Sequence, residues 1–372
     1  MPGKGLEDVI AAQTSISDID GKMGRLFYVG YDIHDLAPHA TFEEIIYLLH
    51  NLKLPDSTEL DDLNEQLIAE REISPFIEDL MPTMASQTSP MSMLRTLVSA
   101  MSAYDPDGWD QSERANYRKA MRLVARFPTV IAAYDRLRNE LDPVRPNPKL
   151  SHAANFLYML KGIEPNDEDA RILDICLVLH ADHTMNASTF TARVVASTLA
   201  DIHSATTAAI ASLKGPLHGG ANEAVMKMLL EIKDPSRAEE YIKQKLARQE
   251  KIMGFGHRVY KTEDPRATHL RQLSRQLGEQ IGDTRWYEIS KRIEEVVMAE
   301  KHLYPNVDFY AASVYYSLGI PVDLFTPVFA ASRVSGWTAH IREQYADNRI
   351  IRPESEYIGP RGRKWVPIEE RA

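Results

Sequence analysis

Apolar residues recur at helical spacing through much of this chain, and that pattern restricts its fold more than any other feature. Two stripes show it most clearly: Leu60, Leu63, Leu67 and Ile68, and then Ile289, Ile293, Val296 and Val297. Spacings of three and four residues place side chains on one face of an amphipathic helix. Residues 172–179 are almost all apolar, which predicts a helix that is buried on most sides.

Capping residues and prolines predict where several helices begin. Thr41 with Glu44, and Ser236 with Glu239, have the spacing of a capping box. Proline is tolerated in the first turn of a helix because the missing N–H has no partner there in any case. Four prolines stand where helices could begin: Pro90, Pro128, Pro235 and Pro327.

Evidence for strands is confined to one short region near the N-terminus. Between Ile16 and Val29, two short apolar runs flank Asp20-Gly21, a dipeptide typical of hairpin turns. Residues 141–148 are rich in proline and indicate a stiff loop rather than a long linker. The expected fold is therefore mainly α, with a small N-terminal β element.

Charge balance and the lack of long apolar runs exclude several classes of protein. Lys plus Arg number 43 against 53 for Asp plus Glu, a formal net charge of −10, so no basic face for nucleic acid is expected. A small anionic substrate stays compatible, because local arginines do not require a positive total. No apolar stretch reaches the roughly 18 residues of a membrane span, and residues 1–8 lack the apolar core of a signal peptide. The single cysteine, Cys176, suits a reducing compartment, so a cytoplasmic protein is expected.

Two histidines lie in glycine-rich turns. His218 stands in Gly215–Gly220 (GPLHGG), and His257 stands in Gly254–Arg258 (GFGHR). Glycine lets backbone and ligand approach an imidazole closely, and imidazole can act as acid or base near neutrality. The pair therefore indicates two proton donors in one cleft. The alternative for either residue is that it only caps a helix or fills a turn.

Asp308 is an isolated acid followed by an aromatic and apolar run. It could simply cap a helix N-terminus. In an apolar setting its proton affinity would rise instead, which suits a general base. A carboxylate removes a weakly acidic carbon proton only if partners stabilise the enolate oxygen, and His218 and His257 could do so.

Four motifs in this order closely resemble the citrate synthase family. They are Pro216–Asn222 (PLHGGAN), Gly254–Tyr260 (GFGHRVY), Asp264–Arg266 (DPR) and Val307-Asp308. The likeness covers most of the chain, from Gly5-Leu6-Glu7 and residues 25–32 to Ile350–Pro353 (IIRP). It implies a two-domain helical fold and the condensation of acetyl-CoA with oxaloacetate and water to citrate and CoA, the entry of the tricarboxylic acid cycle.

The resemblance assigns three catalytic roles. His218 would donate a hydrogen bond to the thioester carbonyl of acetyl-CoA while Asp308 takes a methyl proton to form the enol. His257 would polarise the ketone of oxaloacetate and protonate the alkoxide after the carbon–carbon bond forms. Hydrolysis of citryl-CoA would then release citrate and CoA.

The same resemblance implies a site for the dicarboxylate substrate. The positions that match the family's oxaloacetate contacts are His183, His218, His257, Arg266, Arg333 and Arg352. Arginine forks bind carboxylates through two parallel bonds, although an arginine taken singly is more often a solvated surface group. In the family, the counterpart of Arg352 reaches into the partner subunit's site, which implies a homodimer.

CoA binding and domain organisation are also implied by the resemblance. The residues expected near CoA are Lys251, Gly254, Phe255, Gly256 and Lys261, although a short glycine turn is not specific by itself. Residues 1–219 and 320–372 would form a large helical domain, and 220–319 a small one that closes over oxaloacetate. Acetyl-CoA is a substrate, so no cofactor and no metal is expected. The likeness begins near residue 5, so an N-terminal domain for NADH inhibition is expected to be missing.

Three alternatives remain open at this point. A helical metal-dependent hydrolase could use His180 and His183 with Asp182, Asp201 and His203, but these residues form no recognisable ligand motif. A helical scaffold without activity is favoured by no feature of the sequence. A 2-methylcitrate synthase would carry the same motifs and use propionyl-CoA, and one methylene is worth only about 1–3 kcal/mol in an apolar pocket.

Overall fold

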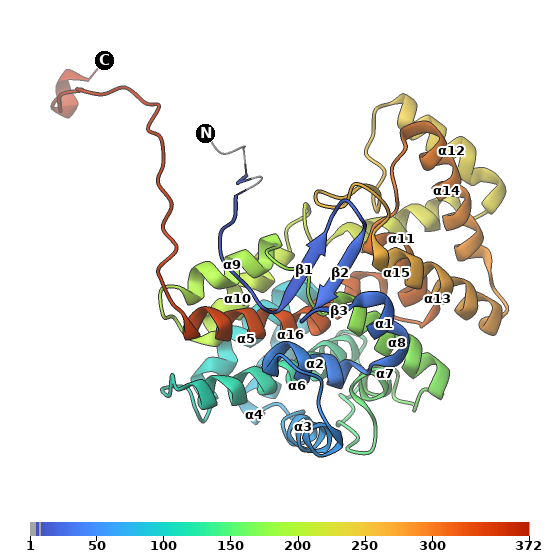
Figure 1. Cartoon of the computed structure of the whole chain (residues 1–372), viewed down its shortest axis with the longest axis horizontal. Helices are drawn as coiled ribbons and strands as arrows, with labels where there is room; N and C mark the ends of the chain where they lie inside the picture. The colour runs from blue at the N-terminus through green and yellow to red at the C-terminus, as the bar shows by residue number, and fades with distance from the viewer. Residues whose placement is uncertain (1–4, 7–8, 372) are drawn as a thin grey trace.

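The computed structural model of this chain describes residues 5–6 and 9–371 and is built mainly of helices (Figure 1). Glu7 of the Gly5-Leu6-Glu7 motif lies outside the described residues, as do most of residues 1–8 and Ala372. The first helices are α1 (Ile33–His39), α2 (Phe42–Asn51), α3 (Ser57–Ala69), α4 (Pro75–Ala85), α5 (Pro90–Met101), α6 (Glu113–Arg138), α7 (His152–Lys161) and α8 (Asp167–His180). They are followed by α9 (Ala187–Ala196), α10 (Ile202–Leu213), α11 (Ala221–Ile232), α12 (Pro235–Ala247), α13 (Pro265–Ile281), α14 (Arg285–Lys301), α15 (Val307–Ser317) and α16 (Phe325–Ala346).

The predicted hairpin is confirmed and is extended by a third short strand. Strands β1 (Ser17–Asp20), β2 (Arg25–Tyr28) and β3 (Tyr31–Asp32) form one antiparallel sheet in sequence order. The Asp20 carboxylate accepts the backbone N–H groups of Lys22 and Met23, at 3.0 and 2.9 Å, and so closes the turn between β1 and β2. The two-residue strand β3 carries no alternating pattern, and for that reason the sequence did not reveal it.

The apolar stripes lie on helices, as predicted. Leu63 and Leu67 are buried on α3, and Ile289, Ile293, Val296 and Val297 are buried on α14. The apolar run 172–179 forms the second half of α8, where all but one of its residues are buried.

Two of the predicted helix starts are wrong. Thr41 and Glu44 form the expected capping box, but Asp234, not Ser236, caps α12 and accepts the Ser236 N–H at 2.8 Å. Asp234 is the cap because the helix already begins at Pro235, which places Ser236 inside the first turn. Pro128 lies inside α6 and does not begin a helix. Its lost hydrogen bond is offset by the packing of this long helix against α16, α7, α5 and α4.

The remaining prolines behave as expected. Pro90 and Pro235 are the first residues of α5 and α12, and Pro327 lies in the first turn of α16.

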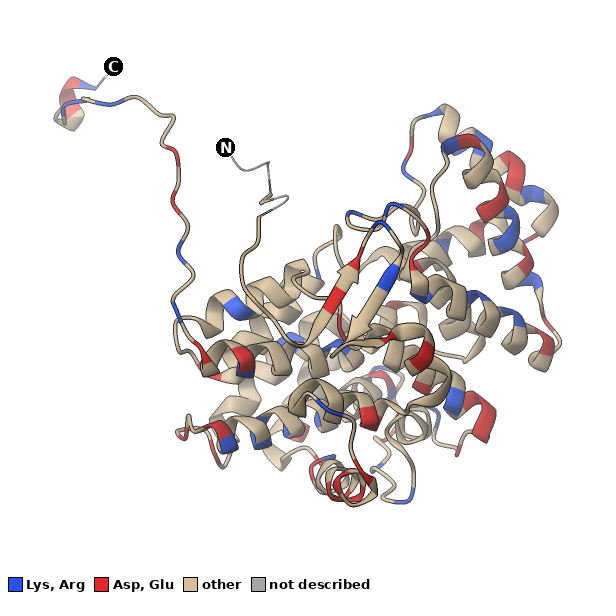
Figure 2. Ribbon diagram, in the orientation of Figure 1, with Lys and Arg blue, Asp and Glu red and all other residues tan. Residues whose placement is uncertain are grey.

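Helix α16 occupies the centre of the molecule. It packs against α2, α6, α8, α9 and α10, and its residues from Phe325 to Ile341 are buried. Helices α11 to α15 gather to one side of this assembly, and the segment after α16 runs away from the body (Figure 1). Acidic and basic residues are interspersed along α12, α13 and α14 (Figure 2). No helix in the described part of the chain is long and apolar enough to cross a membrane.

Candidate active site

His183 is presented by a tight turn that follows α8. Its side chain is buried, with 7% of the residue exposed, and its Nε2 lies 3.2 Å from the Tyr260 hydroxyl. The His183 and His257 rings stand 5.1 Å apart, nearly edge to face. Burial, followed by the charge of Arg266, holds the pKa of His183 well below its usual value, so the imidazole is neutral.

His257 is held in one tautomer by the backbone that follows it. Its Nδ1 accepts the N–H groups of Val259 at 3.0 Å and Tyr260 at 3.2 Å. Backbone N–H groups can only donate, so the ring proton belongs on Nε2. Burial and then the charge of Arg266 lower the pKa of His257 to about 4. The residue is therefore a neutral donor near pH 7.

His218 lies in the turn between α10 and α11 and is oriented in a similar way. The backbone N–H of Ser188 donates to its Nε2 at 3.3 Å, and the Ser188 hydroxyl lies 2.8 Å from the same atom. The proton of the neutral ring consequently belongs on Nδ1. Burial and then the charge of Arg333 lower the pKa of His218 to about 4.

Asp308 is the second residue of α15 and does not cap it. The cap is Asn306, whose side chain accepts the Asp308 N–H at 3.1 Å, so the reading of Asp308 as a simple cap is wrong. Burial raises the pKa of Asp308 to about 7, against the opposing charges of Arg266 and Arg333. A carboxyl group that titrates near neutrality suits a general base.

Arg266 is paired inside the chain rather than free. Its Nε and Nη2 donate to the two oxygens of Asp264 at 2.9 and 2.7 Å, and both side chains are buried. Asp264 also accepts the N–H of Val307 at 3.2 Å, which ties the start of α13 to the start of α15. The ion pair thereby fixes Arg266 beside Asp308.

Arg333 is a buried arginine on α16 without an acidic partner. Its Nε donates to the His180 carbonyl at 2.7 Å, and its guanidinium lies 4.6 Å from the centroid of the Phe329 ring. Burial lowers its pKa to about 10, and among the described residues no carboxylate lies within ion-pair distance. A buried unpaired cation is costly, and an anionic ligand would relieve that cost.

The structure brings most of the expected residues together. Besides burial, Arg333 influences the pKa of His183, His218 and Asp308, and Arg266 influences that of His183, His257 and Asp308. Five separate segments of the chain therefore lie within electrostatic reach of these two buried arginines. Sequence reasoning missed Ser188 and Tyr260 as supports of the histidines, because a contact between distant residues leaves no local pattern.

The expected CoA residues lie on one loop. Lys251 and Lys261 are exposed at its ends, and Gly256 donates its N–H to the Tyr304 carbonyl at 2.9 Å. The Phe255 ring is buried against Phe309, with centroids 4.5 Å apart. Arg352 is exposed in the segment after α16, and the structure does not bring it to the other expected oxaloacetate residues among those it describes.

The residues of the alternative metal site serve other purposes. His180 Nδ1 bonds to the Cys176 carbonyl at 2.7 Å, Asp201 caps α10, and His203 lies 3.4 Å from Asp105. No group of three or more His, Cys, Asp and Glu residues in the described part of the chain is placed to hold a metal ion.

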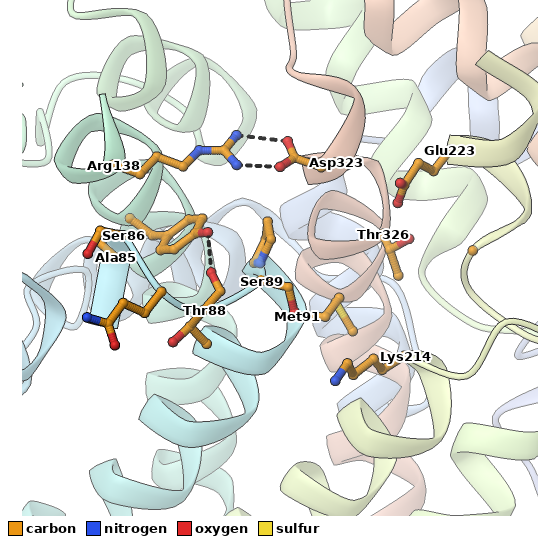
Figure 3. Close-up of a pocket in the computed structure, with 14 residues that line it drawn as sticks. Ala85, Ser86, Thr88, Ser89, Met91, Arg138, Lys214, Glu223, Asp323 and Thr326 are labelled. Carbon is orange, nitrogen blue, oxygen red and sulfur yellow. Dashed lines mark hydrogen bonds and ion pairs between the residues drawn. The ribbon is translucent and has the colours of Figure 1, made fainter. Parts of the chain in front are cut away.

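A cavity of ≈ 700 Å³ is lined by Lys214 and Gly220, which precede and follow His218 in the chain, and Figure 3 shows its lining side chains. Lys214, Gly220, Glu223 and Thr326 line one side of it, where the chain enters α11 and α16. On another wall Arg138 and Asp323 point toward each other and form an ion pair (Figure 3). None of His183, His257 and Asp308 lines this cavity.

Comparison with known proteins gives a consistent result. The family model "Citrate synthase, C-terminal domain" matches residues 5–354. "Citrate synthase 2" of Bacillus subtilis is 54% identical over 370 residues, covering 99% of both chains, and "Citrate/2-methylcitrate synthase" of the same species is 44% identical, covering 96% of both. A citrate synthase of Thermoplasma acidophilum, solved with carboxymethyl coenzyme A and oxaloacetate, superposes with a TM-score of 0.93 at 36% identity, covering 99% of each chain. With its motifs, fold and relatives in agreement over nearly the whole length, the chain belongs to the citrate synthase family.

Proposed function

We propose that this enzyme condenses acetyl-CoA with oxaloacetate and water to give citrate and CoA. The observation that carries the proposal is one carboxyl group of pKa about 7, Asp308, and two neutral histidines of fixed tautomer, each influenced by one or both of the same two buried arginines. Carbon acid chemistry near neutrality needs such a base together with donors that stabilise the oxygen.

The chemistry divides between the three side chains. The Asp308 carboxylate takes a proton from the acetyl methyl group while His218 donates from Nδ1 to the thioester oxygen, which gives the enol. The enol carbon attacks the ketone carbon of oxaloacetate while the enol proton returns to His218, and His257 gives its Nε2 proton to the resulting alkoxide. Water then attacks the thioester carbonyl of citryl-CoA and loses a proton that restores His257. The C–S bond breaks, the CoA thiolate takes the proton held by Asp308, and citrate and CoA leave.

Oxaloacetate binds among the buried cations. Arg333 has an unpaired guanidinium, Arg266 is fixed beside Asp308, and His183 adds a neutral donor or acceptor. A carboxylate of oxaloacetate would compensate the charge of Arg333, whereas the charge of Arg266 is already balanced by Asp264.

The second subunit completes this site. We infer a homodimer in which Arg352 of each subunit reaches the oxaloacetate site of the other. The segment after α16 supports this arrangement, because it leaves the body and exposes apolar side chains: Tyr357 is 58%, Ile358 92% and Trp365 79% exposed. Apolar residues of this kind are normally covered by a partner.

CoA would lie along the loop that carries Lys251, Gly254, Phe255, Gly256 and Lys261, with the two exposed lysines near its phosphates. Residues 220–319 would act as a small domain that closes over oxaloacetate. Helices α11 to α15 support this division, because they pack mainly on one another. No cofactor takes part in the proposed reaction. A cytoplasmic location is inferred as well, and the buried, unpaired thiol of Cys176 agrees with it.

Acetyl-CoA is the proposed donor in preference to propionyl-CoA. The Bacillus subtilis relative named only for citrate is more similar, at 54%, than the one also named for 2-methylcitrate, at 44%. The test is to measure kcat/KM of the purified protein for both thioesters, with release of the CoA thiol as the assay. Acetyl-CoA should be preferred about tenfold or more. A preference for propionyl-CoA would reassign the donor, and no thiol release from either would refute the proposed function.

A further inference from the structure

The β1–β2 hairpin touches both segments that carry the neighbouring histidines His183 and His257. Ser17 begins β1 and contacts the turn that holds His183, whereas Gly21 directly follows β1 and contacts the loop that holds His257. In Figure 1 the tip of the hairpin lies beside the loop between α12 and α13, in agreement with the contact between Gly21 and Lys261.

At its base, the hairpin closes the His183 turn through Asp182. The Ser17 hydroxyl donates to Asp182 Oδ2, and the Thr184 N–H donates to the same oxygen at 3.0 Å. Thr184 has φ of 47°, an unfavourable backbone conformation for a β-branched residue. The buried carboxylate and Ser17 therefore hold in place a turn that would otherwise relax.

The second strand, β2, also contacts Asp182. Tyr28, which pairs with Ser17 across the sheet, is fully buried. Its hydroxyl accepts the N–H of Asp182 at 3.2 Å and lies 3.0 Å from the Asp182 carbonyl. Both strands consequently fix the residue that precedes His183.

At its tip, the hairpin fits closely against the His257 loop. The Gly21 carbonyl accepts the Lys261 N–H at 2.8 Å, and a Cβ at Gly21 would stand 2.4 Å from the Val259 carbonyl oxygen. The N–H of that same Val259 holds the His257 ring at 3.0 Å. Gly21 therefore packs against the carbonyl of the same residue, Val259, whose N–H orients the His257 ring.

We propose that this hairpin is a positioning element for oxaloacetate, with Ser17 setting the His183 turn and Gly21 setting the His257 loop. The inference rests on the proposed function. Because Ser17 begins β1 and Gly21 directly follows its last residue, one hydrogen-bonded hairpin fixes the 5.1 Å spacing of the two rings before substrate arrives. Preorganised spacing lowers the cost of binding and keeps the reacting atoms aligned.

The test compares Ser17→Ala and Gly21→Ala with Met23→Ala. Met23 lies in the same turn but is 70% exposed, so its variant controls for changes in the hairpin as such. Oxaloacetate affinity is measured by calorimetry without thioester, and kcat by thiol release. Ser17→Ala should weaken oxaloacetate binding about tenfold, Gly21→Ala should lower kcat about tenfold or more, and Met23→Ala should stay within about twofold.

A rescue variant separates positioning from loss of folding. Glycine adopts φ of 47° without help, so Thr184→Gly in the Ser17→Ala background should recover most of the oxaloacetate affinity. Should Gly21→Ala fail to fold, this pair alone carries the test. Unchanged affinity in folded Ser17→Ala, or equal losses in Met23→Ala, would overturn the inference. Failure of the proposed function is distinct, because the unmodified protein would then release no thiol.

Discussion

The carbonyl of Gly254 accepts the backbone N–H of Asn306 at 2.9 Å. This bond joins the loop of His257 to the cap of the helix that carries Asp308, although the two segments are far apart in sequence. Asn306 strengthens the junction by donating from its side chain to the Gly256 carbonyl at 3.1 Å. The relative position of a proposed acid and a proposed base therefore depends on a few main-chain contacts.

Gly254→Ala should disturb that junction. Gly254 has φ of 83°, and a Cβ there would stand 2.8 Å from both Phe309 Cδ2 and Val225 Cγ2. We expect a loss of about 1–3 kcal/mol in the free energy of unfolding and a lower kcat, measured by denaturant titration and thiol release. The matched control is Gly282→Ala, which has a similar φ of 74° but open space around the site. Equal kcat values for both variants would contradict the prediction.

Replacement of the proposed base should abolish most turnover. Asp308→Ala should lower kcat by about 10² to 10⁴, the usual contribution of a positioned general base. Oxaloacetate affinity should change much less, because binding is assigned to the arginines and His183. A rate near that of the unmodified enzyme would remove Asp308 from the mechanism.

The pH dependence of the reaction should report the same group. The base must be deprotonated, and the pKa of Asp308 is raised to about 7, so kcat/KM should fall as the pH drops below about 7. His218 and His257, with pKa values of about 4, stay neutral through this range and add no limb. The measurement is kcat/KM for acetyl-CoA between pH 5 and 9 at saturating oxaloacetate. A value that stays constant from pH 8 down to pH 5 would disprove the assignment.

Stability should respond to pH in the opposite sense. A carboxyl group whose folded pKa is raised binds its proton more tightly in the folded state, so its contribution to stability is lost as the pH rises from about 4 to about 7. Asp308→Asn removes this penalty and should raise the Tm at pH 8 relative to the unmodified chain. At pH 4 the two Tm values should differ much less, and differential scanning calorimetry at both pH values checks this.

The sequence predicted the helices better than it predicted the residues that orient the proposed catalytic side chains. Stripes such as Leu63 and Leu67 act through local spacing, so they locate α3 without tertiary information. The motif residues His183, His257 and Asp308 could likewise be named from short patterns. Ser236 and Pro128 misled because a neighbouring Asp234 and a buried long helix overrode local rules. Ser188 could not be foreseen as the support of His218, since that contact exists only after α9 and the His218 turn pack together.

The last prediction tests whether Arg352 acts across the dimer. Heterodimers are prepared by co-expression with two affinity tags, one subunit carrying Arg352→Leu and the other His257→Ala. If each site takes Arg352 from the opposite subunit, the site in the Arg352→Leu subunit is complete. That site has its own intact His257 and receives an intact Arg352 from the His257→Ala subunit. Such a heterodimer should show about half of the unmodified activity, because one of its two symmetric sites is complete.

Arg333→Leu supplies the matched control for that experiment. Arg333 is buried in the same chain as His183 and His218, so it serves its own subunit's site. A heterodimer of Arg333→Leu and His257→Ala then contains one defect in each site and should stay inactive. No activity in the Arg352→Leu pairing would show that Arg352 does not cross the interface. Activity in the control would show instead that Arg333 does not serve its own subunit's site. Oxaloacetate affinity should fall in both single-variant homodimers, because either change removes one carboxylate contact.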